Sequence, residues 1–198
     1  MLVVVVDGHD HRLRFGLRIA QRGDHVDTGA VGQAEVHERK AEALGAHQLQ
    51  RIVILGHSGG ATAGAALLTM GRTRVACAVL TSGAYGLLER ARMLGMSRGG
   101  RTDTTGSAQF YDPLEHVGGI VRDPARRIVL IGNRDDRNTP FALQQRFADA
   151  VAQAGHRIEL QTHAAEPPTH HDLTDGIGLQ TASLCARAAL FPPTPATE

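Results

Sequence analysis

The chain has 198 residues and a mass of 21.1 kDa, which predicts one domain. Apolar residues make up 42% and charged residues 21%, so a buried core can form and wholesale disorder is not expected. The formal net charge of +1 excludes a strongly basic nucleic-acid binder, and no apolar run reaches the roughly 18 residues of a membrane span, so neither nucleic acid nor membrane is an expected partner.

Short apolar runs separated by helical patterns predict an α/β fold. Strands are expected at residues 2–6, 51–55, 75–81 and 127–131, with an alternating edge strand at 157–161. Helices are expected at 33–44, 61–70, 87–96, 141–154 and 181–190. This alternation predicts a mostly parallel sheet with helices on both faces.

The ends of the chain and its two cysteines give further expectations. Residues 1–190 are predicted to form the single domain, and 191–198 a Pro-rich C-terminal tail. The first seven residues lack a basic region, so no signal peptide is expected. Cys77 and Cys185 lie far apart in apolar patterns and are interpreted as two buried thiols, and a cytoplasmic location is the default expectation.

The most informative motif is G-x-S-x-G, present as Gly56-His57-Ser58-Gly59-Gly60. It follows a predicted strand and opens a predicted helix, which is the context of a nucleophile on a sharp strand-to-helix turn. Such a turn is strained, so the residues two before and two after the serine must be small, as Gly56 and Gly60 are. The Gly59 N–H at the helix N-terminus is then half of an oxyanion hole.

Two other interpretations of the motif need no nucleophile. A tight turn with a capping serine has the same glycines, and so does a Gly-rich phosphate cradle. The sequence has neither G-x-G-x-x-G nor the lysine of a P-loop here, which disfavours the cradle. A serine nucleophile would in addition need a base and an acid that orients it.

Both partners follow later strands. Asp135 and Asp136 come after the strand at 127–131, and His163, His170 and His171 come after the strand at 157–161. The order serine, acid, histidine, each at the carboxyl end of a strand, is the order of α/β-hydrolases.

Together these elements resemble the α/β-hydrolase superfamily, and within it the dienelactone-hydrolase and prolyl-oligopeptidase-like branch. The resemblance extends over residues 50–175 and rests on the elbow, on Gly132-x-x-Asp135 followed by Pro140, and on the segment 155–160. It implies an α/β-hydrolase-like fold with a small or absent lid. It also implies a serine hydrolase that cleaves carboxylic esters through an acyl-enzyme, with peptides as the second substrate class and no cofactor or metal.

The resemblance also assigns the roles. Ser58 is the expected nucleophile, and Asp135 is preferred to Asp136 as the acid because it stands three residues after Gly132. His171 is the expected base, with His170 as the alternate, because His-Asp-Leu matches the usual pattern of the family. His163 is a weaker candidate because it stands close to the strand end.

The first 50 residues depart from the pattern of the family. One clear strand precedes the elbow strand, where the family has several. If residues 2–6 form the strand that supplies the second oxyanion donor, Gly8 and His9 stand at that position. If they form the strand beside the elbow strand, the hydrolase is shortened, and its exposed sheet edge is compatible with a homodimer.

Two competing functions stay open. His9 and His11 form an H-x-H pair at a strand end and are the candidate ligands of a metal-dependent hydrolase. The shortened N-terminal part also suits a non-catalytic α/β-hydrolase-like binding protein. In that case the three triad side chains are expected beyond hydrogen-bond reach of one another.

Overall fold

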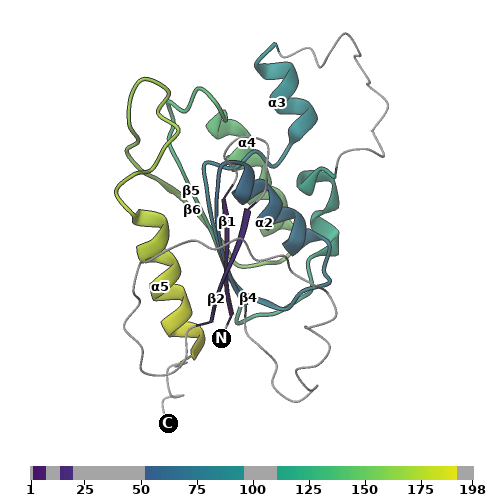
Figure 1. Cartoon of the computed structure of the whole chain (residues 1–198). Helices are drawn as coiled ribbons and strands as arrows, with labels where there is room; N and C mark the ends of the chain where they lie inside the picture. The colour runs from purple at the N-terminus through teal and green to yellow at the C-terminus, as the bar shows by residue number, and fades with distance from the viewer. Residues whose placement is uncertain (1, 8–13, 20–51, 96–110, 191–198) are drawn as a thin grey trace, which may run out of the picture.

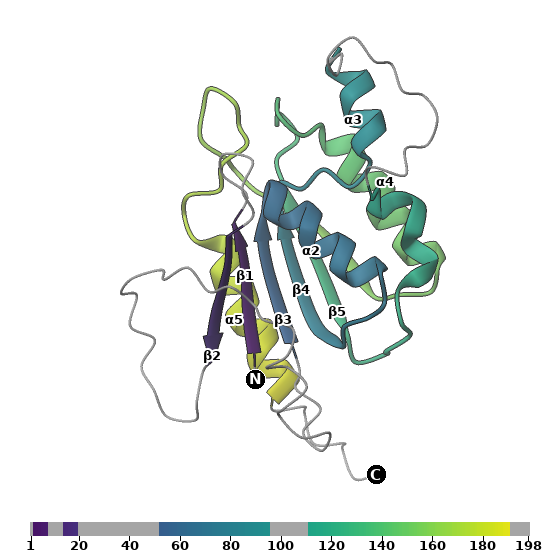
Figure 2. The ribbon, with the colours of Figure 1, turned by 45° about the vertical axis from the view of Figure 1, so that its right-hand side comes forward.

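A six-stranded mixed sheet is the centre of the computed structural model, which describes residues 2–7, 14–19, 52–95 and 111–190. Its spatial order is β2-β1-β3-β4-β5-β6. The strands are β1 (Leu2–Asp7), β2 (Arg14–Ile19), β3 (Ile52–His57), β4 (Val75–Thr81), β5 (Arg127–Gly132) and β6 (Ile158–Thr162). Only the β1–β2 pairing among these strands is antiparallel, as the opposed arrow of β2 in Figure 2 shows.

Helices cover both faces of this sheet (Figure 1), which confirms the predicted fold class. The first face packs against α2 (Gly59–Thr69), α4 (Phe141–Gln153) and the 3-10 helix η1 (Pro113–Gly119). The other face packs against α5 (Ile177–Leu190). None of the described helices is both long and apolar enough to cross a membrane.

Small residues bring α2 close to the sheet. A Cβ atom added at Gly64 would stand 2.8 Å from a methyl of Leu80 and 2.9 Å from a methyl of Ile54, so any larger residue would force these side chains to shift. On α4 the apolar residues recur every four positions, and Leu143, Phe147 and Val151 are fully buried. The helical spacing of the sequence therefore places the predicted face of α4 in the core.

A buried aspartate links the two helical segments between β4 and β5. The carboxylate of Asp112 accepts hydrogen bonds from the backbone N–H of Leu87, at the start of α3 (Leu87–Met93), and from that of Leu114 in η1, at 2.9 and 3.2 Å. Burial raises the pKa of Asp112 above its ordinary value of 3.8. The 3-10 helix itself was not predicted. The region of the expected small lid includes residues 96–110, which lie outside the described part.

The N-terminal strands settle one of the open alternatives. Strand β1 pairs in parallel with the elbow strand β3, so residues 2–6 lie directly beside it, as in the second predicted placement. The prediction of one preceding strand is wrong, because β2 was missed: its run Arg-Phe-Gly-Leu-Arg-Ile mixes charge and glycine with apolar residues. Gly8, His9, His11, the helix expected at 33–44 and the tail at 191–198 lie outside the described residues.

The interpretation of the cysteines as free thiols is wrong. Cys77 on β4 and Cys185 on α5 form a disulfide, with their Cα atoms 6.1 Å apart and both side chains buried. The two residues are 108 positions apart in the sequence, and only the packing of α5 on the sheet brings them together. Disulfides are rare in reducing compartments, so this pair removes the cysteine argument for a cytoplasmic location.

Candidate active site

Ser58 occupies a strained turn between β3 and α2. Its backbone has φ 52° and ψ −118°, an unusual conformation for a residue with a side chain. A Cβ atom on Gly56 would stand 2.5 Å from the carbonyl oxygen of Gly60, so the turn requires glycine there. The Ser58 N–H donates to the Thr81 carbonyl at 2.9 Å, which anchors the turn to β4. The elbow that the motif predicts is therefore present in the geometry.

His171 is in hydrogen-bond contact with this serine. It lies in the loop between β6 and α5, and its Nε2 is 2.8 Å from Ser58 Oγ. The ring is buried, with 7% of the side chain exposed. Its second nitrogen, Nδ1, is 2.9 Å from a carboxylate oxygen of Asp136. A carboxylate only accepts hydrogen bonds, so Nδ1 carries the proton and Nε2 accepts from the serine hydroxyl.

The carboxylate at the histidine is Asp136 and not Asp135, which the sequence analysis preferred. Asp136 is fully buried in its side chain, and its other oxygen accepts the N–H groups of Asn138 and Thr139 at 2.8 and 2.7 Å. Asp135 is exposed, and its backbone N–H donates to the Asn133 side chain. The turn after β5 thus directs the second aspartate inward, and counting residues from a glycine cannot show which carboxylate that is.

Backbone contacts fix the loop that carries His171. Ser82, directly after β4, is buried and donates its hydroxyl to the His171 carbonyl at 2.7 Å. Its own backbone has a positive φ of 50°, and its N–H donates to the Ile131 carbonyl of β5. The Arg137 N–H donates to the Thr169 carbonyl at 2.9 Å, which joins the loop of Asp136 to the loop of His171. Residues at the ends of β4 and β5 therefore hold His171 in place.

The two alternate histidines lie elsewhere. His170 has a φ of 53°, and its ring contacts the Ala165 carbonyl at 3.3 Å. His163 pairs with the Asp175 carboxylate, and this hydrogen bond holds the pKa of Asp175 below its ordinary 3.8. Of the three predicted histidines, only His171 is in contact with Ser58 in the described structure.

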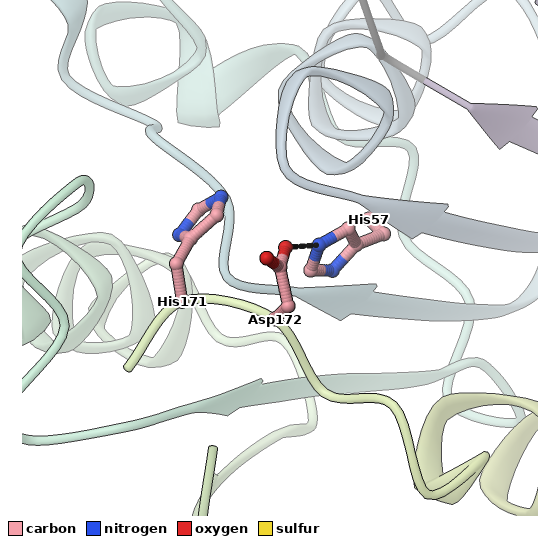
Figure 3. Close-up of side chains that lie close together, drawn as sticks. All are labelled: His57, His171 and Asp172. Atoms are coloured by element: carbon pink, nitrogen blue, oxygen red, sulfur yellow. Dashed lines mark hydrogen bonds and ion pairs between the residues drawn. The ribbon is translucent and has the colours of Figure 1, made fainter. Parts of the chain in front are cut away.

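Two further polar residues beside the serine were not predicted. His57 Nε2 is 3.3 Å from the Asp172 carboxylate, and His57 Nδ1 is 2.9 Å from the Thr81 hydroxyl. The rings of His57 and His171 lie 5.4 Å apart between centroids. Figure 3 shows Asp172 between the two rings. Both residues stand within the motifs quoted for Ser58 and His171, so the signal was adjacency to a predicted catalytic residue.

An apolar hollow of about 360 Å³ begins beside the elbow. It follows one side of α2 toward its C-terminus. Its lining consists of Gly59, Thr62, Ala63, Ala66, Leu67, Met70 and Tyr111. Most of these side chains are apolar, which suits a nonpolar group more than a charged one.

Comparison with solved structures identifies the fold. One form of Pyrococcus horikoshii acylaminoacyl peptidase matches 70% of this chain at 13% identity and a TM-score of 0.52, over 22% of the peptidase. An acylaminoacyl peptidase in complex with Z-Gly-Gly-Phe-chloromethyl ketone matches 74% of this chain at 15% identity and a TM-score of 0.51, over 24% of that protein. These are α/β-hydrolase fold proteins. The chain has the α/β-hydrolase fold.

These matches cover only part of each peptidase, so they support the fold alone. The chain spans about a quarter of the length of the peptidases it matches. No family model and no curated protein matches the sequence. At such low identity the likeness concerns the fold, so the chemistry has to be argued from the side chains around Ser58.

Proposed function

We propose that the protein is a serine hydrolase with Ser58 as nucleophile, His171 as base and Asp136 as the acid that orients the base. The observation that carries the proposal is the continuous hydrogen-bonded chain from Ser58 Oγ through both nitrogens of His171 to Asp136, at 2.8 and 2.9 Å. A non-catalytic relative needs no such alignment, and its side chains were expected apart. The strained φ of Ser58 supports the same conclusion, since strain of this kind clusters at functional sites.

The chemistry follows from this geometry. His171 Nε2 takes the hydroxyl proton as Ser58 Oγ attacks the substrate carbonyl, and later delivers it to the leaving group. Asp136 stabilises the imidazolium that forms in between. Water then releases the acyl group from Ser58 by the same route in reverse. No cofactor takes part in these steps.

The oxyanion has one proposed donor among the described residues. The Ser58 N–H is already bonded to Thr81, whereas Gly59 is the first residue of α2, where backbone N–H groups lack helical partners. A developing negative charge there is stabilised by the helix dipole as well as by the hydrogen bond. The second expected position, at Gly8 and His9, lies outside the described residues.

Carboxylic esters with a nonpolar group are the proposed substrates, and peptides are the second class. The apolar hollow that begins at Gly59 supports an ester, because it offers few polar partners to a peptide backbone. A cytoplasmic location stays a prediction.

A fluorophosphonate probe tests the proposal directly. The full chain is treated with the probe, and the adduct is located by mass spectrometry, with Ser58→Ala as the control. Labelling at Ser58 that disappears in the variant is expected, followed by hydrolysis of short aryl esters. Well-folded protein that stays unlabelled would overturn the proposal.

A further inference from the structure

Three side chains of metal-binding types meet beside the proposed nucleophile. His57 stands at the end of β3, and His171 and Asp172 stand in the loop before α5 (Figure 3). One ligand atom from each lies within 4.8 Å of the others, and no second group of this kind is found among the described residues. Two imidazoles and one carboxylate are the donor set of many zinc sites that keep a fourth position open.

Each imidazole is held from behind by an oxygen. His171 Nδ1 donates to the buried Asp136 carboxylate at 2.9 Å, so Nε2, which accepts from Ser58 Oγ at 2.8 Å, is the nitrogen that a metal would have to take. His57 Nδ1 lies 2.9 Å from the Thr81 hydroxyl. Metal-bound histidines commonly donate their second N–H to such an oxygen, which fixes both the tautomer and the ring. The ring of His57 and the tautomer of His171 are therefore set before any ion arrives.

The tautomer of His57 can adapt to an ion. The Thr81 hydroxyl donates to the Gly56 carbonyl at 3.2 Å, so its oxygen can accept the Nδ1–H of His57. In that arrangement the lone pair of His57 Nε2 is directed away from Thr81 and toward Asp172. A neutral histidine with its proton on Nδ1 is the form that ligates through Nε2.

The spacing of the donors also suits zinc. Tetrahedral zinc with bonds of about 2.0–2.2 Å places its ligand atoms roughly 3.3 Å apart. The fold already provides this spacing for two of the ligands, because His57 Nε2 and the Asp172 carboxylate are 3.3 Å apart. One ligand atom of His171 lies within 4.8 Å of those of His57 and Asp172, so His171 would have to move toward them to bind the same ion.

We propose that His57, His171 and Asp172 bind a divalent zinc-type ion, and that this ion inhibits the hydrolase. The reason is competition for one atom: while the Nε2 lone pair of His171 is bonded to the metal, it cannot accept the proton of Ser58. The inhibition rests on the proposed function, whereas the binding of the ion does not. Removal of the ion by a chelator frees His171 and restores the base.

Direct titration tests the binding. The chelator-treated, tag-free full chain is titrated with zinc chloride by calorimetry, alongside His57→Gln and Asp172→Asn. Loss of one ligand is expected to weaken this site by roughly tenfold or more, as even changes in the groups that support metal ligands do. Thermal unfolding verifies that each variant is folded, and the exposed Asp172 provides a conservative change if His57→Gln unfolds.

A second histidine–aspartate pair provides the matched control. His163 and Asp175 have side-chain exposures of 29% and 54%, against 27% and 54% for His57 and Asp172, but they have no third ligand in the described structure. His163→Gln is therefore expected to leave the zinc site intact. The proposal would be overturned in favour of scattered surface binding if His163→Gln weakened zinc binding as much as the site variants do. It would also be overturned if neither His57→Gln nor Asp172→Asn weakened zinc binding.

Probe labelling separates the two proposals. Zinc is expected to slow fluorophosphonate labelling of the wild-type chain, and EDTA to restore it, whereas Asp172→Asn is expected to need at least tenfold more zinc for the same effect. Zinc bound at the site without any effect on labelling would overturn the inhibition. A chain that is never labelled, even without zinc, would contradict the proposed hydrolase, while the titration with Ser58→Ala still decides whether the metal site exists.

Discussion

Replacing Asp136 with asparagine should remove most of the activity without unfolding the protein. One oxygen of Asp136 accepts the N–H groups of Asn138 and Thr139, and the other accepts from His171. An asparagine keeps the first two bonds through its carbonyl oxygen. Its NH₂ group then faces His171 Nδ1, so two donors would meet unless the histidine moves its proton to Nε2. In that tautomer Nε2 cannot accept the proton of Ser58.

The magnitude follows from the wrong tautomer. In serine hydrolases that keep their geometry, this change lowers kcat by about 10⁴, which corresponds to about 5 kcal/mol of lost transition-state stabilisation. The thermal midpoint should change little, because both bonds to the turn persist and the side chain keeps its volume. The expected pattern is thus a large loss of kcat, a small change in KM and a folded protein.

The neighbouring aspartate is the matched control. Asp135 carries the same carboxylate one position away, but its side chain is exposed, and the carboxylate at His171 in the described structure is that of Asp136. Ester hydrolysis by Asp135→Asn should stay within about twofold of wild type, the range of ordinary surface changes. Both variants are assayed on the same ester at saturating concentration. A large loss in Asp135→Asn with an active Asp136→Asn would refute the assignment of the acid.

Three further expectations concern stability. Phe147→Ala should lower the free energy of unfolding, measured in urea, by about 3–5 kcal/mol. Phe147 is fully buried, and its ring stacks on that of Tyr85 with the centroids 4.5 Å apart. A loss under about 1 kcal/mol would contradict this packing. Replacing both Cys77 and Cys185 with alanine should lower the free energy of unfolding by up to about 5 kcal/mol in the same assay, because their disulfide closes a loop of 108 positions. An unchanged urea midpoint would argue against the disulfide. Burial, and then two nearby arginines, lower the pKa of His156 from 6.5, so the folded state binds fewer protons there than the unfolded state. The contribution of His156 to stability is therefore lost as the pH falls from 6.5 through its lowered pKa. The thermal midpoint of His156→Gln should accordingly fall less on acidification than that of the wild type.

Much of the fold follows from local patterns. The four apolar runs lie within two residues of β1, β3, β4 and β5, and β4 matches at both ends, because a strand buried on both faces has a nearly continuous apolar sequence. The spacing on α4 predicts its buried face, and the small residues after Ser58 predict a helix close to the sheet. Strand β2 and η1 were missed because neither carries a clear apolar period.

Some features of the candidate site likewise follow from local sequence, and others depend on the tertiary structure. The sequence by itself determined the elbow at Ser58 and the order of the loops, since a strained turn needs glycines and each loop directly follows a strand. Tertiary structure decided which aspartate faces His171, because a turn of a few residues can direct either Asp135 or Asp136 inward. It also joined Cys77 to Cys185 and His57 to Asp172, pairs separated by 108 and 115 positions. Local patterns report which residues share a helix or strand, whereas contacts between distant segments depend on how the helices and loops pack on the sheet.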